Sequence, residues 1–187
     1  AAFEELWFYI FFVTGATILV TLILYTGTDR NFALSVRHGF FQVISQMTGT
    51  GFATTDYMLW PQGGWFIMIL LMPAGGCTGS TTGGIKMARH LITLRNLKVV
   101  FQRFQHHHAV IPIKINDRIV PDNLNITILS FTLLYIALTL AGMIAIHFTG
   151  VPLIEAVGAS TSAISNVGPG LGASGNFGHY NGFTAGA

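Results

Sequence analysis

Two short stretches of this chain repeat one pattern, and that repeat limits what the chain can fold into more than any other feature. Residues 45–52 read SQMTGTGF and residues 162–169 read SAISNVGP, so the offset between the two copies is 117 residues. A longer apolar segment precedes each copy, at residues 6–26 and 126–148. Long helix, short helix and glycine loop is the order that a re-entrant membrane loop requires. Aligned at this offset, four positions correspond: Ser45 with Ser162, Met47 with Ile164, Thr48 with Ser165, and Gly51 with Gly168.

The composition places most of the chain in a membrane. Hydrophobic residues make up 51% of it and charged residues only 9%, whereas a soluble domain is about 25% charged. Residues 6–26 and 126–150 contain no Asp, Glu, Lys or Arg, and each segment has about the 20 residues that cross the hydrocarbon core. Neither is a secretory signal, because no basic region precedes the first and the second is internal. We therefore expect an all-α membrane protein that is surrounded by membrane lipid.

The basic residues are concentrated in one stretch. Seven of the nine Lys and Arg residues lie between Lys86 and Arg118. The positive-inside rule predicts that residues 86–118 are cytoplasmic. A nucleic-acid-binding patch is the competing interpretation, but basic residues interleaved with apolar ones beside a membrane span favour a topological role. We expect no nucleic-acid partner.

The pattern along the chain predicts two pore repeats. The first covers residues 1–104, a cytoplasmic linker covers 105–121, and the second repeat covers 122–187. The tail from residue 173 has the composition of an external loop, and no crossing follows it. We therefore expect the second repeat to lack its last helix and the chain to be part of a larger protein. Within the first repeat the expected parts are a membrane helix at 3–26, a pore helix at about 33–47, a filter at 48–52 and a broken helix at 62–104.

The glycine motifs have the chemistry of a potassium filter. A potassium ion loses its hydration shell only where oxygens replace it, and backbone carbonyls do so without trapping the ion by a net charge. Pointing several carbonyls at one axis needs extended or left-handed backbone, which glycine adopts without strain. The C-terminal ends of the two short helices would also favour a cation. Neither loop contains Asp or Glu, which argues against a divalent-ion filter made of carboxylates.

Ordinary glycine turns are the alternative, but the matching flanks of the two copies favour a filter, and we expect K+ to bind only there. The expected filter residues are Thr48, Gly49, Thr50, Gly51, Ser165, Asn166, Val167 and Gly168.

A second motif interrupts the broken helix at residues 73–84. A lipid-facing helix would not tolerate this run of glycines and hydroxyl residues, because its freed backbone groups would stay unpaired in hydrocarbon. We expect a loop inside the protein, beneath the filter, that obstructs the permeation path and can move. A nucleotide-binding loop is disfavoured, because Gly84-Ile85-Lys86-Met87 lacks the Gly-Lys-Ser/Thr of that motif. The expected gating-loop residues are Gly75, Gly76, Cys77, Thr78, Gly79, Ser80, Thr81, Thr82, Gly83 and Gly84.

Other functional classes fit less well. The membrane segments contain no paired acids, no nucleophile with a base and no metal-ligand spacing, so we expect neither an enzyme nor a cofactor. His106-His107-His108 is more typical of a solvated linker than of a metal site. A secondary transporter of another fold, with broken helices that bind a small solute or ion at the midplane, remains the alternative function. A scaffolding subunit would not need two matching glycine loops.

At these motifs the chain resembles the TrkH/KtrB superfamily of potassium transporters, and the TrkH family most closely. The third repeat of that family is similar to residues 50–57 (TGFATTDY), and the fourth repeat is similar to residues 162–170 (SAISNVGPG). Its intramembrane gating loop is similar to residues 75–86. The resemblance covers essentially the whole chain.

The resemblance implies a potassium-channel-like fold of four repeats, each with a membrane helix, a pore helix, a filter loop and a second membrane helix. It implies potassium uptake across a bacterial inner membrane, with K+ as the transported ion. It also implies a homodimer and a cytoplasmic, nucleotide-binding regulatory subunit of the RCK type, similar to TrkA, that faces residues 86–118.

Overall fold

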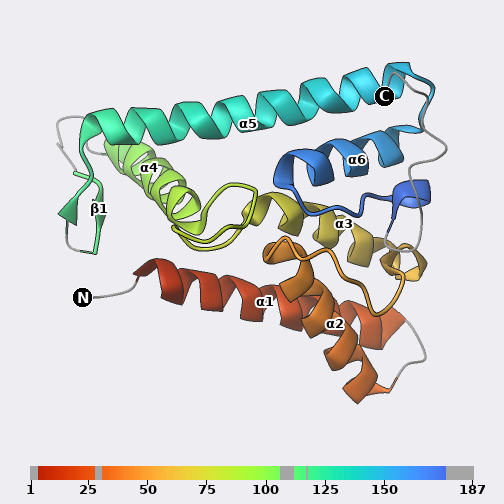
Figure 1. The fold of residues 1–187 in the computed structure, drawn as a ribbon. Helices are drawn as coiled ribbons and strands as arrows, with labels where there is room; N and C mark the ends of the chain where they lie inside the picture. The colour runs from red at the N-terminus through yellow and green to blue at the C-terminus, as the bar shows by residue number, and fades with distance from the viewer. Residues whose placement is uncertain (1–3, 28–30, 106–111, 117, 176–187) are drawn as a thin grey trace.

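The computed structural model describes residues 4–27, 31–105, 112–116 and 118–175, and these residues form a helical structure with one small hairpin (Figure 1). The elements follow in chain order: α1 (Glu4–Gly27), α2 (Phe32–Met47), the 3-10 turn η1 (Tyr57–Leu59), α3 (Gln62–Leu71), the 3-10 turn η2 (Met72–Ala74), α4 (Met87–Gln105), β1 (Lys114–Ile115), β2 (Arg118–Ile119), α5 (Asp122–Phe148), α6 (Leu153–Ser165) and the 3-10 turn η3 (Gly172–Ser174).

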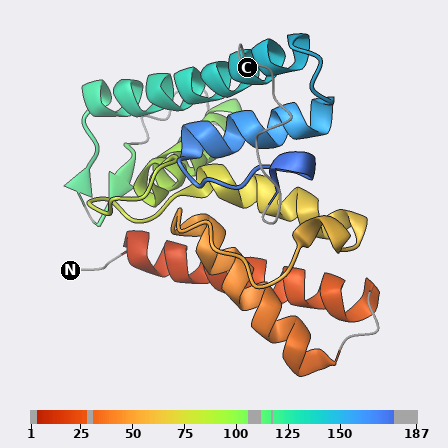
Figure 2. The same ribbon diagram turned by 45° about the vertical axis from the view of Figure 1, so that its right-hand side comes forward.

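Helices α1 and α5 are long and apolar enough to cross a membrane. Only 11% of the most apolar stretch of each is buried within the chain, and large side chains such as Phe11, Leu133 and Phe148 are 70% exposed or more. Such surfaces need lipid or further protein around them. Figures 1 and 2 show α1 and α5 on opposite sides of the structure, running in the same direction, with α3 and α4 between them. The two repeats are therefore parallel rather than inverted.

Each short helix packs against the long helix that precedes it, and small residues permit the close approach. A Cβ atom added to Gly39 of α2 would lie 2.9 Å from Thr21 Oγ1 of α1. In the second repeat, a Cβ atom added to Gly142 of α5 would lie 2.6 Å from Ser160 Oγ of α6. Ser160 Oγ donates to the carbonyl of Thr139 at 2.7 Å. Small residues and interhelical hydrogen bonds of this kind hold membrane helices together where hydrophobic burial cannot.

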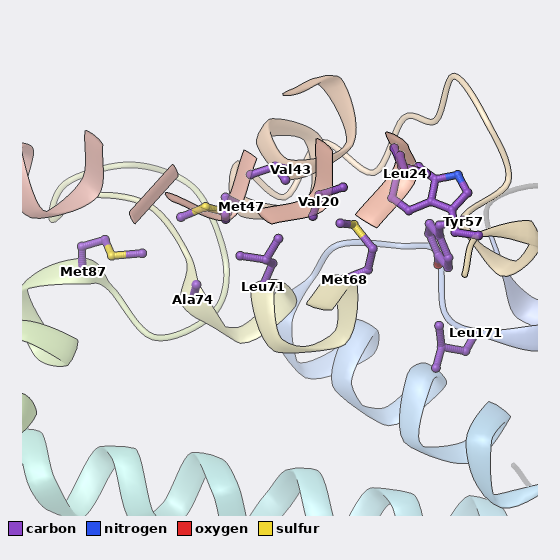
Figure 3. Close-up of a cluster of buried hydrophobic side chains, with 12 residues drawn as sticks. Val20, Leu24, Val43, Met47, Tyr57, Met68, Leu71, Ala74, Met87 and Leu171 are labelled. Atoms are coloured by element: carbon purple, nitrogen blue, oxygen red, sulfur yellow. The ribbon is translucent and has the colours of Figure 1, made fainter. Parts of the chain in front are cut away.

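The buried apolar side chains form a cluster around α3 (Figure 3). Tyr57, which is fully buried, donates its hydroxyl hydrogen to the carbonyl of Gly170, 113 residues away. The segments that follow the two glycine loops are thus joined directly. The labelled members of the cluster come from both repeats and from the segments between helices: Val20, Leu24, Val43, Met47, Tyr57, Met68, Leu71, Ala74, Met87 and Leu171.

The expected break in the second crossing is present as a loop between η2 and α4. Helix α4 begins at Met87, two residues after the expected restart. The delay has a local cause: the N–H of Ile85 donates to Pro73 O at 2.8 Å, and that of Met87 donates to Gly76 O at 3.0 Å. These two bonds close the loop at its base, so the chain leaves α3 and joins α4 at nearly the same place.

The expected cytoplasmic linker contains a hairpin that the sequence did not predict. Strands β1 and β2 pair antiparallel, with Lys114 opposite Ile119 and Ile115 opposite Arg118. Asn116, at φ 48°, supplies the left-handed residue of the turn. Residues 106–111, which include the three consecutive histidines, and most of the expected external tail, residues 176–187, lie outside the described residues.

Candidate functional site

The two glycine loops have the same backbone hydrogen bonds at the repeat offset. In the first loop, Gly49 N donates to Gln46 O at 3.2 Å and Thr50 N donates to Ser45 O at 3.0 Å. In the second loop, Asn166 N donates to Ala163 O at 3.2 Å and Val167 N donates to Ser162 O at 3.0 Å. Both pairs of bonds satisfy C-terminal carbonyls of the preceding helix. The repeat in the sequence is therefore also a repeat in local structure.

Left-handed backbone occurs at the same two positions of both loops. In the first loop these are Gly49 at φ 65° and Gly51 at φ 73°. In the second they are Asn166 at φ 56° and Gly168 at φ 108°. Glycine takes this conformation without strain, and asparagine takes it more readily than other residues with a side chain. The two loops therefore share left-handed backbone at corresponding positions as well as corresponding hydrogen bonds.

Several carbonyls of the two loops accept no hydrogen bond from the described residues. In the part of the chain that the structure describes, no N–H or O–H donates to the carbonyls of Thr48, Gly49, Thr50, Asn166 or Val167. Most backbone carbonyls in proteins are paired, so this run of unpaired ones is unusual. Thr50 and Asn166 are exposed, and Thr48 and Gly49 are partly exposed.

Side chains of α2 and α6 hold the loops in place. In the first repeat, Ser45 Oγ donates to Phe52 O at 2.6 Å, and Gln42 Nε2 donates to Thr55 O at 2.7 Å. In the second repeat, Gly168 N donates to Ser162 Oγ at 3.0 Å. The loop conformations are therefore fixed by buried polar side chains, which are 3% exposed or less for Ser45, Gln42 and Ser162.

The two loops meet each other. A Cβ atom added to Gly51 would lie 2.3 Å from the carbonyl oxygen of Val167. One added to Gly49 would lie 3.6 Å from the carbonyl oxygen of Asn166. The structure thus brings the eight expected filter residues together from segments 117 positions apart in the sequence.

The glycine loop of residues 75–84 reaches both of these loops. A Cβ atom added to Gly83 would lie 2.0 Å from Ser165 O, and Gly49 lies close enough that its Cβ would be 3.9 Å from Gly83 N. The expected gating-loop residues do not all make such contacts: Thr78, Gly79, Ser80 and Thr81 are exposed. Within the described residues, the approach to the expected filter is made at Gly83, in the C-terminal part of the loop.

Lys86 folds the loop from within, a role that the sequence did not predict. Its ammonium group donates to the carbonyl and hydroxyl oxygens of Ser80, at 2.8 and 3.2 Å, and to Thr82 Oγ1 at 3.1 Å. It also donates to the carbonyl of Thr82. These bonds leave the lysine without the spare donors that a phosphate would need. Within the described residues, no three His, Cys, Asp or Glu side chains gather as a metal site.

Comparisons with known proteins agree on one family. The TrkH family profile, described as a cation transport protein, matches residues 4–184. The Trk system potassium uptake protein TrkH of Halomonas elongata is 31% identical over 165 residues, which are 88% of this chain and 34% of that protein. The corresponding protein of Escherichia coli K12 is 33% identical over 159 residues, which are 83% of this chain and 32% of that protein.

A solved structure agrees with the sequence matches. The crystal structure of the potassium transporter TrkH from Vibrio parahaemolyticus superimposes with a TM-score of 0.85 at 27% identity, over 91% of this chain and 36% of that one. The chain thus spans about a third of the length of the relatives that it matches.

Proposed function

The chain belongs to the TrkH family of cation transport proteins, and on that basis we propose that it is part of a potassium uptake protein. In this proposal Thr48–Gly51 and Ser165–Gly168 form two sides of a K+ selectivity filter. Two loops do not enclose an ion path, so further loops of the same kind would complete it.

One observation carries the filter proposal. Both loops have the same left-handed positions, and their carbonyls at residues 48–50 and 166–167 accept no hydrogen bond within the described residues. An uncharged oxygen cage of this kind replaces the hydration shell of a monovalent cation and still releases it. Carboxylates, which would hold a divalent ion more strongly, are absent from both loops.

We propose further that residues 75–84 form the gate. Contact of Gly83 with Ser165 and the approach of Gly49 to Gly83 N support a position directly against the filter. The loop is exposed from residue 78 to residue 81 and is closed at its base by backbone hydrogen bonds. It can therefore move without unwinding α3 or α4.

The finer assignments rest on the family resemblance. We propose a bacterial inner-membrane location with residues 86–118 in the cytoplasm, a homodimer, and a nucleotide-binding cytoplasmic subunit of the RCK type as regulator. The basic side chains of Lys98, Arg103, Lys114 and Arg118 are exposed, which supports an acidic protein surface as the partner there.

Substitution of the two filter glycines tests the proposal. Serine at Gly51 would be strained and would also collide with Val167 O at 2.3 Å, whereas serine at Gly168, with no atom within 4 Å of its Cβ, would suffer backbone strain alone. A side chain in left-handed backbone costs about 1–2 kcal/mol, which is about a tenfold change in an equilibrium. We expect K+/Na+ selectivity of flux into vesicles to fall about tenfold for Gly168→Ser and further for Gly51→Ser.

Gly150→Ser is the matched control. Gly150 also has positive φ, at 94°, and open space around it, but it lies outside both loops. Selectivity that falls equally in all three variants, or in none, would contradict the filter assignment.

A further inference from the structure

The first turn of α1 holds the loop of residues 75–84 at its exposed residue Thr78. Glu5 Oε1 accepts hydrogen bonds from the backbone N–H of Thr78 and, at 2.9 Å, from its hydroxyl group. The same oxygen accepts from Ala88 N at 3.3 Å. One carboxylate therefore connects the loop, which precedes α4, to the N-terminal end of α4 itself. A negative group is favourable at a helix N-terminus because it meets unpaired N–H groups and the positive end of the helix dipole.

The neighbouring residue, Glu4, connects the same turn of α1 to the cytoplasmic segments. Glu4 Oε2 accepts from Arg95 Nη2 of α4 and from Asn116 N of the hairpin, both at 2.9 Å. Glu4 N donates in return to Asn116 Oδ1 at 3.1 Å, and Arg95 donates to the carbonyl of Lys114. Two adjacent carboxylates thus hold the hairpin and α4 on one side and the glycine loop on the other.

We propose that Glu5 is a positioning residue for the gate: it keeps residues 77–79 in the closed position and releases them when the hairpin or α4 shifts the first turn of α1. This inference rests on the proposed gating role of the loop. Lys86 holds residues 80–82 of the loop by hydrogen bonds to Ser80 and Thr82. Glu5 binds Thr78 from outside the loop. Residues 77–79 are therefore held by α1 and not by Lys86.

The alternative is that Glu5 only caps the N-terminus of α4. The corresponding residue of the second repeat distinguishes this structural role from a role in positioning the gate. At the offset of 117 residues Glu5 corresponds to Asp122, which also lies in the first turn of a long apolar helix. Asp122 is exposed, and among the described residues no hydrogen bond or ion pair joins it to residues 75–84. It matches Glu5 in charge and in position on its helix, but not in contact with the loop.

Cys77, the only cysteine of this sequence, is a built-in reporter of the loop. It is adjacent to Thr78 and partly buried. The experiment uses the full-length protein in vesicles, with any cysteines outside this sequence replaced. The rate of Cys77 modification by a membrane-impermeant maleimide on the cytoplasmic side is measured together with K+ flux.

Glu5→Ala is expected to raise the modification rate of Cys77 about tenfold, since the loss of a hydrogen bond to a charged group shifts an equilibrium by about that factor. K+ flux without the cytoplasmic partner should rise with it. Glu5→Gln keeps an acceptor oxygen and is expected to lie between Glu5→Ala and the unchanged protein. Asp122→Ala should leave both readouts unchanged.

An unchanged Cys77 rate in Glu5→Ala overturns the inference, as does an equal effect of Asp122→Ala. If modification rises but flux does not, a variant that lacks residues 76–83 decides which statement fails. High flux in that variant overturns the role of Glu5 in gating and leaves the gate itself in place. Low flux in that variant overturns the proposed gate, and the role of Glu5 in flux fails with it.

Discussion

At the residue scale, Asn166 is the most informative member of the second loop. It occupies the position that Gly49 has in the first loop, and it adopts the same left-handed backbone at φ 56°. Asparagine is the residue with a side chain that best tolerates this conformation, because its short amide can hydrogen-bond locally. The two loops therefore reach one geometry by different residues.

Substitutions at Asn166 should separate backbone conformation from side-chain chemistry. Asn166→Gly keeps the left-handed conformation and is expected to retain K+/Na+ selectivity within about twofold, whereas a β-branched residue there is strained by about 1–2 kcal/mol or more. Asn166→Val should therefore lose selectivity. Ion flux into vesicles, measured separately with K+ and Na+ gradients, checks both variants. Loss of selectivity in Asn166→Gly would indicate that the amide group itself, rather than the backbone, matters for the ion.

At the scale of elements, the loop of residues 75–84 leaves the chain between η2 and α4 and returns to nearly the same place. Gly75 and Gly84 lie so close that a Cβ atom on Gly84 would be 3.2 Å from Gly75 N. The gap left by removal of residues 76–83 is therefore short, and the bond from Ile85 N to Pro73 O remains to hold the junction. We expect this deletion to raise K+ flux several-fold and to make it independent of the cytoplasmic partner.

The selectivity of the deletion variant is the internal control. The two loops of the proposed filter keep their hydrogen bonds with Gln42, Ser45 and Ser162 when residues 76–83 are removed, so selectivity should persist. A variant that inserts into the membrane normally but conducts no better than the intact protein would show that the loop is structural and that the gate lies elsewhere.

The sequence predicted those elements whose signal is local. The long helices, the short helices and the glycine loops each have a composition or period that is readable within about 20 residues. The hairpin was missed because strands of two residues have no readable alternation of polar and apolar side chains. The contact of Glu5 with Thr78 was not predicted because it joins residues 73 positions apart. The residues beside Glu5 contain no pattern that indicates which distant residue it binds.

Within the candidate site, the sequence predicted the two loops but not the forces that shape them. A glycine motif indicates unusual backbone. It does not predict that Lys86 holds the loop of residues 75–84 by hydrogen bonds to Ser80 and Thr82. From the sequence, Lys86 could only be compared with the lysine of a phosphate-binding loop. The direction of the Lys86 side chain depends on how the loop of residues 75–84 folds back on itself, and only the tertiary structure gives that information.

At the scale of the whole molecule, the repeats are parallel, and a helix pair connects them. Helices α4 and α5 are joined by reciprocal bonds between Asn96 and Asn125, at 2.7 and 3.0 Å. Arg89 of α4 lies over the ring of Phe131 of α5, 4.0 Å from its centre, a cation–π arrangement. These contacts fix the relative position of the two repeats on the side where the hairpin lies (Figure 1).

The proposed cytoplasmic position of residues 86–118 predicts which end of α5 faces which side of the membrane. In a variant with Cys77 replaced, single cysteines at Arg118 and Pro152 lie just beyond opposite ends of α5, and both positions are exposed. We expect an impermeant thiol reagent to label Arg118→Cys only from the cytoplasm and Pro152→Cys only from the outside. Labelling of both from one side would contradict the topology, and with it the cytoplasmic position of residues 86–118.

The contact between the loops that follow α2 and α6 has a consequence for the charges around the proposed filter. Each helix terminus carries about half a negative elementary charge, and the loops that follow the two helices touch each other. Residues 44–52 and 161–169 contain no acidic, basic or histidine side chain. The negative potential that these two segments would supply to the proposed filter therefore comes from peptide dipoles, which do not titrate. Acidification that would neutralise a ring of carboxylates would leave these peptide dipoles unchanged.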